Sequence, residues 1–187
     1  MDGFDVNDLH FMKPRNNTLG GQTVVIKLGT KSPTIIIRKV VCTKVDVEHH
    51  RQSIVYALDD VHFFKSIDET TLKMAYAHSK EWFGKEIATH EVRALFVPSV
   101  HTIELKTKLT DPEVFDIRLQ KIVMPDFSSL VGKPIDIVVE ILGVYFTPGR
   151  FGLSYRTTQI KLLPIYVLTT YSFFDDNDSD FSDAEPN

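Results

Sequence analysis

Apolar side chains recur with a period of two residues along most of this chain. That period is the period of a β-strand, whose successive side chains point to opposite faces. It predicts strands over residues 23–28 and 34–46, joined by a turn over residues 29–33 with Lys31 at its tip. A further hairpin is expected over residues 53–65.

One segment follows a helical period instead. Residues 66–83 carry apolar residues at the spacing of one helix face, which predicts a helix that packs on the core. Ser66 and Glu69 have the spacing of a capping box that begins the helix. Gly84 is placed to end it, since glycine readily adopts the left-handed conformation after a helix.

The strand pattern returns after this helix. Residues 92–97 and 100–106 are predicted strands, and residues 115–120 alternate so that one face would be buried and the other wet. A loop is expected over residues 125–134, and a last apolar strand over residues 165–174.

The clearest pattern spans residues 135–163, where two strand-like runs flank Thr147, Pro148 and Gly149. Proline presets φ and glycine permits a positive φ, so this is a predicted tight hairpin. Aromatic rings beside guanidinium groups on a β surface suit stacked bases and phosphates. The alternative is an ordinary core hairpin with buried aromatic side chains. The aromatic and basic residues near the turn are Tyr145, Phe146, Arg150, Phe151, Tyr155 and Arg156.

Together these elements predict a mainly β fold of roughly seven to ten strands with one central helix. We expect an elaborated OB-fold-like Greek-key barrel, whose usual helix lies between its third and fourth strands. A β-sandwich or jelly roll stays open, because periodicity counts strands without pairing them. The predicted organisation is a flexible lead-in over residues 1–21, a single domain over 22–174 and an acidic disordered tail over 175–187.

Composition narrows the class of protein. The length of 187 residues, with 43% hydrophobic and 25% charged residues, suits one globular domain with a real core. The single cysteine, Cys42, excludes an intramolecular disulfide framework and a cysteine-based zinc finger. The first residues are acidic and lack the apolar run of a secretory signal, and no apolar run is long enough to span a bilayer, so an intracellular location without a membrane partner is expected.

Charge is distributed unevenly along the chain. Six of the 25 acidic residues lie in residues 175–187, which contain no Lys or Arg. The preceding residues therefore carry 19 acids against 21 bases, a net charge of +2, while the tail carries −6. A mildly basic body with an acidic tail is typical of proteins whose tail competes with a polyanion.

Motifs for catalysis are absent from the sequence. There is no phosphate-binding glycine loop and no G-x-S-x-G nucleophile turn. His49 and His50 are adjacent, so on extended backbone they point to opposite faces and do not form a metal site. Glu104 and Lys106 have the E-x-K spacing that some metal-dependent nucleases use, which is a lesser hypothesis. We expect no catalytic residues, no metal and no cofactor.

The chain resembles the compact single-stranded-DNA-binding replication proteins of short-tailed phages and their relatives in large eukaryotic DNA viruses. The resemblance rests on the β-rich body, the helix over 66–83, the hairpin G-V-Y-F-T-P-G-R-F-G-L-S-Y-R-T-T-Q-I-K over 143–161 and the acidic aromatic tail over 173–187. It implies an OB barrel that coats single strands without sequence preference. It also implies a tail that contacts replication proteins and gates the DNA groove.

The hypothesis is therefore a non-catalytic, non-sequence-specific single-stranded-DNA-binding protein that supports DNA replication, recombination or repair. Basic residues would neutralise phosphates, and Tyr145, Phe151 and Tyr155 would stack bases. The predicted nucleic-acid-binding residues are Lys27, Lys31, Arg38, Lys39, Lys44, Tyr145, Arg150, Phe151, Tyr155, Arg156 and Lys161. The predicted partner-binding tail residues are Phe174, Asp175, Asp176, Asp178, Asp180, Phe181 and Asp183.

Strict alternation in the second hairpin strand refines this hypothesis. It places Tyr155, Gln159 and Lys161 on one face and leaves Arg156 on the apolar side. Besides single-stranded DNA, replication proteins at the tail and a homodimer are expected partners. The rival hypothesis is a structural or interaction protein, a β-sandwich component of a virion or scaffold.

Overall fold

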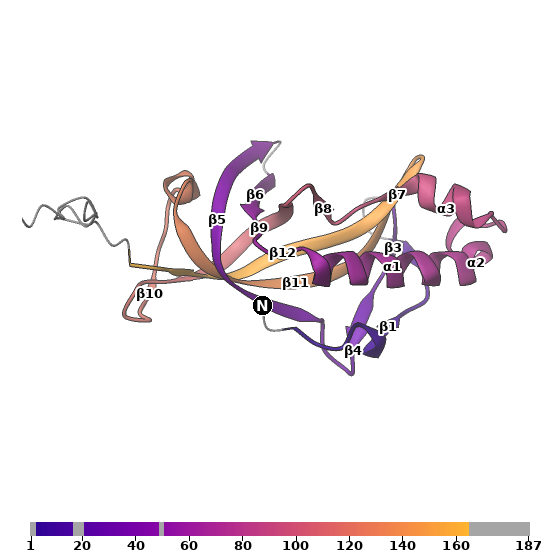
Figure 1. Ribbon diagram of the computed structural model, residues 1–187, viewed down its shortest axis with the longest axis horizontal. Coiled ribbons are helices and arrows are strands. Elements are labelled where there is room, and N and C mark those ends of the chain that lie inside the picture. Colours follow the sequence, from indigo (N-terminus) through magenta and orange to yellow (C-terminus); the bar gives the residue numbers. More distant parts are fainter. Residues whose placement is uncertain (1–2, 17–20, 49–50, 165–187) are drawn as a thin grey trace, which may run out of the picture.

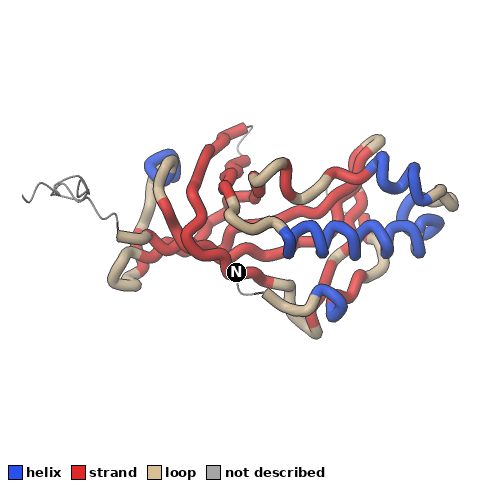
Figure 2. The backbone as a smooth tube through the Cα atoms, in the orientation of Figure 1, coloured by secondary structure: helices blue, strands red, loops and turns tan. Residues whose placement is uncertain are grey.

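The computed structural model describes residues 3–16, 21–48 and 51–164 of the chain. Its body is a curved sheet of long strands, with the α-helices gathered along one side and at one end (Figures 1 and 2). Within these residues, no helix is long and apolar enough to cross a bilayer.

Five strands close into a barrel: β5 (Thr34–Glu48), β6 (Arg51–Ala57), β9 (Glu104–Phe115), β11 (Pro134–Thr147) and β12 (Arg150–Leu162). Strand β5 pairs with β6, β6 with β9, β9 with β12, β12 with β11, and β11 again with β5. The β9–β12 pair is parallel and the other four pairs are antiparallel. The sheet therefore closes on itself.

The order around the barrel is first, second, third, fifth, fourth strand, which is the Greek-key topology of the OB-fold. This confirms the predicted mainly β, OB-like class. The predicted alternative of two packed sheets is wrong because the five strands belong to one sheet whose pairings form a closed ring. The helices are inserted between the second and third barrel strands, whereas the expected place was between the third and fourth.

The hairpin of β11 and β12 forms as predicted. Gly149 in its turn has φ +76°, the left-handed conformation that the Thr-Pro-Gly sequence favours. Register shifts between Cys42 and Lys44, and between Val138 and Val139, mark irregularities in the long strands. Such β-bulges bend strands, which helps strands of this length to curve around a small barrel.

The barrel interior is filled mainly by β-branched and leucine side chains that alternate with outward residues. It also contains a polar chain in which the Tyr56 hydroxyl lies 2.9 Å from Thr157 Oγ1, itself 2.7 Å from Thr107 Oγ1. These partners satisfy hydroxyl groups that would otherwise be costly to bury. Burial raises the pKa of Tyr56.

The main helix begins earlier than predicted. Helix α1 spans His62–Ala77 and is followed by α2, Ser79–Phe83. The Asp60 carboxylate accepts a hydrogen bond from the His62 amide (2.8 Å) at the helix start, so the second half of the predicted hairpin is wrong. Ser66 does not cap the helix, because its hydroxyl donates to the Phe63 carbonyl.

The strand predicted over residues 92–97 is also wrong. Residues predicted as a strand over 92–97 form α3 (Thr89–Leu95) and only then the short β7 (Phe96–Val97), because the Glu91 carboxylate accepts from the Ala88 amide (3.2 Å) and caps a helix. Gly84 ends α2 with φ +75°, as predicted.

The predicted alternating strand over 115–120 is a turn between β9 and β10 (Lys121–Ile122). The Asp116 carboxylate accepts from the Arg118 and Gln120 amides, both at 2.8 Å, and this holds the turn. Its apolar side chains are therefore outside the core rather than on a buried face, with Leu119 64% exposed. The loop expected over 125–134 contains the 3-10 helix η2 (Phe127–Leu130).

The helices cover the end of the barrel near the β11–β12 turn (Figure 1). Trp82 is buried against Phe146, with ring centroids 5.8 Å apart, and Phe83 lies edge-on to both Phe146 and Phe151. This aromatic cluster joins α2 to the hairpin. Separately, the short β8 (Val100–His101) pairs with the start of β9.

The N-terminal residues also belong to the fold. They form η1 (Val6–Asp8), β1 (Leu9–Phe11) and β2 (Arg15–Asn16), followed by β3 (Gln22–Val24) and β4 (Ile26–Leu28). Leu9 is buried and Phe11 packs against Trp82, so residues 3–16 are not the flexible lead-in that was predicted. Gly143 allows β3 to approach β11, since a Cβ there would lie 2.3 Å from the Val24 carbonyl oxygen.

Candidate nucleic-acid interface

Two aromatic residues predicted to stack bases are buried. Phe151 has no exposed surface and its ring lies nearly parallel to Phe146, with centroids 5.9 Å apart. Tyr155 is 3% exposed, and its hydroxyl lies 2.7 Å from Ser99 Oγ. A ring without an exposed face cannot stack on a base, so the structure contradicts this role for Phe151 and Tyr155. For these two residues, the core-hairpin interpretation holds.

The error comes from a β-bulge. A register shift between Thr157 and Gln159 breaks the strict alternation from which the faces of β12 were predicted. Tyr155 and Thr157 therefore face inward, whereas Gln159 is exposed and Arg156 points outward with 38% of its side chain exposed. The prediction that Tyr155 shares a face with Gln159 and Lys161 is wrong for the same reason.

Four other residues predicted to bind nucleic acid lie near the β11–β12 turn or in and after β4. Tyr145 is half-buried, and burial raises the pKa of its hydroxyl group, while Arg150 is exposed at the start of β12. Lys27 lies in β4, opposite His10 of β1, and Lys31 is exposed in the turn that follows β4. Both lysines lie outside the five barrel strands.

Lysines do gather on the barrel surface formed by β5, β6 and β9. Val55 of β6 has Lys44 of β5 as its neighbour on one side and Lys106 of β9 on the other. Lys108 lies two residues further along β9, opposite Ser53. All three lysine side chains are exposed. We call Lys44, Lys106 and Lys108 the lysine face.

The local sequence explains why these side chains point outward. In L-K-T-K-L, Leu105, Thr107 and Leu109 are buried while the two lysines between them are exposed. The sequence prediction included Lys44, considered Lys106 only for a nuclease and missed Lys108. The period-two alternation of lysine with buried residues was the signal that identifies this face.

An acidic residue organises part of the lysine face. Asp46 Oδ1 lies 2.6 Å from Lys44 Nζ, and Asp46 Oδ2 lies 3.5 Å from Lys106 Nζ. The hydrogen bond from Lys44 and the positive charges of both lysines lower the pKa of Asp46. Asp46 therefore holds the ammonium groups of Lys44 and Lys106 close together on the lysine face.

The positive surface continues onto β12. Arg156 is the neighbour of Lys108 across the parallel β9–β12 pair. On its other side, Arg156 opposes Glu140 of β11 and forms an ion pair with its carboxylate. The Arg156 guanidinium therefore adjoins the lysine face, but part of its charge is neutralised.

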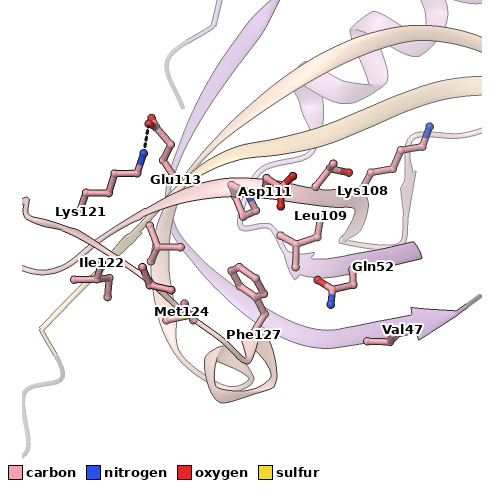
Figure 3. A pocket seen from close by; sticks show the side chains of 14 residues that line it. Val47, Gln52, Lys108, Leu109, Asp111, Glu113, Lys121, Ile122, Met124 and Phe127 are labelled. Carbon is pink, nitrogen blue, oxygen red and sulfur yellow. Dashed lines mark hydrogen bonds and ion pairs between the residues drawn. The ribbon is translucent and has the colours of Figure 1, made fainter. Parts of the chain in front are cut away.

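A cleft of about 1020 Å³ opens beside Lys108, between the β5–β6 hairpin and the segment containing β10 and η2 (Figure 3). Its lining includes apolar side chains, among them Leu109, Met124 and the half-buried ring of Phe127. Gln52 of β6 brings an amide group to the cleft. An aromatic ring, apolar surface and an amide next to lysines can accommodate a flat, polar-edged group.

The far side of the cleft is polar. Lys121 Nζ lies 2.8 Å from Glu113 Oε1, and the Gln159 amide donates to Glu113 Oε2 (3.0 Å). The Lys121 hydrogen bond is the main cause that lowers the pKa of Glu113. This ion pair joins β10 to β9 at the edge of the cleft, as Figure 3 shows.

Three predicted cations lie elsewhere on the barrel. Arg38 and Lys161 line a second, smaller groove on the outer side of β5, β11 and β12. Lys39 has φ +56°, and its backbone amide donates to the Asp136 carboxylate (3.0 Å). The predicted cations are therefore divided: Lys44 and Arg156 at the lysine face, Arg38 and Lys161 at the second groove.

The remaining predictions concern the acidic tail and the nuclease hypothesis. The tail residues Phe174, Asp175, Asp176, Asp178, Asp180, Phe181 and Asp183 lie outside the described residues. For the nuclease hypothesis, the Glu104 carboxylate accepts from the Thr43 hydroxyl (3.4 Å) and Lys106 faces Asp46. Within the part of the chain that the structure describes, no three His, Cys, Asp or Glu side chains form a metal-binding cluster.

Comparison with known families identifies the chain's relatives. Residues 39–176 match a family described as "Family of unknown function (DUF5871)". The chain belongs to the DUF5871 family. This family match includes all five barrel strands except the first residues of β5, so it covers the lysine face and the cleft. No curated protein matches the chain significantly.

Solved structures similar to this DUF5871 chain include the single-stranded DNA-binding protein from bacteriophage Enc34 in complex with ssDNA. It is 12% identical, with a TM-score of 0.49, over 83% of this chain and 97% of that one. A second structure of the single-stranded DNA-binding protein from bacteriophage Enc34 is 13% identical, with a TM-score of 0.49, over 90% of this chain and 98% of that one.

Proposed function

We propose that this DUF5871 protein binds single-stranded DNA, without sequence preference, across the lysine face and the adjoining cleft. The observation that carries the proposal is the position of Lys106 and Lys108. They lie on the outer face of the third strand of an OB barrel, next to the second strand. That face is the one by which OB-folds bind oligonucleotides.

The lysines would supply contacts to the phosphates. Ammonium groups attract the backbone irrespective of base sequence, and binding releases counterions, so affinity falls as salt rises. Arg156 would extend this track toward β12. Because its side chain is less exposed than that of Lys106 (38% against 58%) and it forms an ion pair with Glu140, we expect it to contribute less than Lys106.

The cleft would hold bases. Phe127 presents an aromatic ring at the cleft, and stacking of one base on an aromatic side chain contributes roughly 1–3 kcal/mol. The Gln52 amide can both donate and accept a hydrogen bond, so it can pair with the polar edge of any base. Phe127 thus takes the role that the sequence had assigned to Phe151 and Tyr155.

We further propose that the acidic tail competes with DNA for the lysine face and contacts replication proteins. Residues 175–187 contain six acids and no base, a charge complementary to the lysine face. The protein would act without catalysis, in replication, recombination or repair. A homodimer also remains a prediction.

The test is a fluorescence-anisotropy titration of labelled oligo-dT with the full-length chain at several salt concentrations, repeated with an RNA oligonucleotide and with duplex DNA. The proposal predicts binding to oligo-dT that weakens with salt and exceeds binding to the duplex. Absence of binding to oligo-dT at low salt would contradict it.

The tail is tested in the same titration with residues 175–187 deleted. Competition by the tail predicts tighter binding of oligo-dT at low salt and a smaller difference at high salt, because salt screens the tail as well. Equal affinities at low salt would refute the competition while leaving the DNA-binding proposal intact.

A further inference from the structure

The second groove lies on the outer side of the barrel, where β5, β11 and β12 meet the end of β9. It shares strands β5 and β9 with the lysine face, but Lys44, Lys106 and Lys108 do not line it, and its volume is about 350 Å³. Ile36 of β5 opposes Val138 of β11, and both line the groove together with Phe115 and Leu119 from the end of β9 and the following turn. The groove is therefore largely apolar.

Its apolar side chains are unusually open to solvent for a sheet surface. Ile36 is 38% exposed and Leu119 is 64% exposed. Leu119 also has φ +63°, so the turn holds this side chain at the groove in a backbone conformation that leucine rarely adopts. Apolar side chains grouped around a concave surface mark an interaction site rather than scattered exposure.

The described chain leaves the barrel at this groove. Ile160 and Lys161 line it, and β12 ends at Leu162. Residue 165 follows Leu162 by three residues, which span at most about 10 Å. Residue 165 therefore lies within about 10 Å of the end of β12, which makes the groove reachable for the segment that follows.

That segment has the composition of a buried one. Residues 165–174 read I-Y-V-L-T-T-Y-S-F-F, with no charge and seven large apolar or aromatic side chains among ten. The family match extends to residue 176, so it includes this segment and excludes most of the acidic tail. Leaving such a run in water forgoes about 25 cal/mol for each Å² of apolar surface that could be buried.

We propose that residues 165–174 of the same chain dock in the groove formed by Ile36, Val138, Phe115 and Leu119. The inference does not depend on the proposed function, since the groove and the lysine face are separate surfaces. Its small volume suits a few anchoring side chains, such as the rings of the segment, rather than a folded element.

The charges around the groove are complementary to the acidic residues that follow the docked segment. Arg38 and Lys161 line the groove, and the docked segment is followed directly by Asp175 and Asp176. Docking would thus hold the start of the acidic tail against the barrel.

Photo-cross-linking of the full-length protein tests the proposal. A p-benzoylphenylalanine placed at position 119 should cross-link to residues 165–174, identified by mass spectrometry of the peptides. The same group at position 123, where Val123 is 94% exposed at the other cleft, should not. Mixing isotopically labelled and unlabelled protein separates links within one chain from links between chains.

Two charge substitutions on β5 provide matched variants. Ile36 and Val41 are both 38% exposed, but only Ile36 lines the groove. Ile36→Glu should lower the cross-link yield from position 119 about tenfold, because docking would bury an unpaired carboxylate. Val41→Glu should leave the yield unchanged. Circular dichroism of both variants confirms that each is folded.

Three outcomes would overturn the proposal. Cross-links from position 119 to residues outside 165–174 would show another occupant. Links to residues 165–174 of a second copy would replace docking within the chain by exchange between chains. Equal loss of yield in Ile36→Glu and Val41→Glu would show that the groove itself is not the docking site.

Discussion

Two β segments of this protein carry aromatic or basic residues of the kind that binds nucleic acid, and the fold uses them in opposite ways. Around the β11–β12 turn, Phe151 and Tyr155 are buried beneath the helices, and Tyr155 is hydrogen-bonded to Ser99. In β9, Lys106 and Lys108 point away from the core. The first segment packs into the core, whereas the lysines of the second lie exposed at the surface.

The difference teaches that composition alone does not identify a binding surface. Aromatic side chains pack in a protein core as readily as they stack on a nucleobase, so an aromatic residue in a strand does not by itself indicate a binding site. Lysines that alternate with buried residues are less ambiguous, because Lys is almost never fully buried. The predictions below test this contrast, from the largest expected effect to the smallest.

The largest effect is expected at the buried hairpin. Phe151→Ala removes a fully buried ring that packs against Phe146, Phe83 and Phe96, which should reduce the free energy of unfolding by about 3–5 kcal/mol. Urea denaturation followed by circular dichroism measures it. A loss below about 1 kcal/mol would show that the ring is not part of the core.

The helix-covered side also contains a buried acid. Asp68 of α1 is 8% exposed and accepts hydrogen bonds from the Ser99 amide (2.9 Å) and the Ser99 hydroxyl. Burial raises the pKa of Asp68 to about 6, although the Ser99 hydrogen bonds oppose the shift. The folded state therefore binds this proton more tightly than the unfolded state, in which the pKa is about 3.8.

The contribution of Asp68 to stability should consequently be fully present below about pH 4 and lost as the pH rises through about 6, a fall of roughly 3 kcal/mol. Asp68→Asn, which cannot ionise, should lack that fall. Urea denaturation of both proteins between pH 4 and 7.5 measures the difference. Parallel pH profiles would exclude Asp68 as the titrating group.

At the lysine face, the expected effect is on binding rather than stability. Lys106→Ala combined with Lys108→Ala should weaken oligo-dT binding about tenfold and reduce the slope of log affinity against log salt by about 1.4, since each phosphate contact contributes about 0.7 on single strands. The matched control is Lys65→Ala with Lys80→Ala, two exposed lysines on α1 and α2. Equal effects in both pairs would mean that the lysines act through net charge alone.

The smallest effect concerns the ion pair at the border of the two segments. Glu140→Gln removes the carboxylate that faces Arg156, so the guanidinium can contact phosphate. We expect oligo-dT affinity to rise about twofold, with less than about 1 kcal/mol change in stability, as is usual for a partly exposed ion pair. Adding Arg156→Ala should abolish the gain. A gain that persists would come from net charge instead.

The elements with strong local signals could be predicted from the sequence. The hairpin over 135–163 has β-branched runs and a Thr-Pro-Gly turn, and it forms β11 and β12. Strand β5 forms with nearly the expected bounds. The mainly β class followed from the number of strands, whereas the choice of a closed barrel over a sandwich depends on long-range pairing that periodicity does not contain.

The errors arose where a tertiary or cap interaction overrides periodicity. The bulge after Thr157 reverses the faces of β12, so Tyr155 is inside and Arg156 outside. The helix cap at Glu91 turns a predicted strand into α3. Phe127 was not predicted because it lies in an irregular segment that only the folded chain brings beside Gln52 and Lys108.

Backbone hydrogen exchange, with and without oligo-dT, tests the central claim most directly. The full-length protein is exchanged at low salt and analysed by mass spectrometry of peptides. The account predicts slower exchange on DNA binding in residues 44–56 and 104–111, and around Phe127, with little change in residues 145–156. Protection confined to residues 145–156 would contradict it and return the interface to the β11–β12 turn.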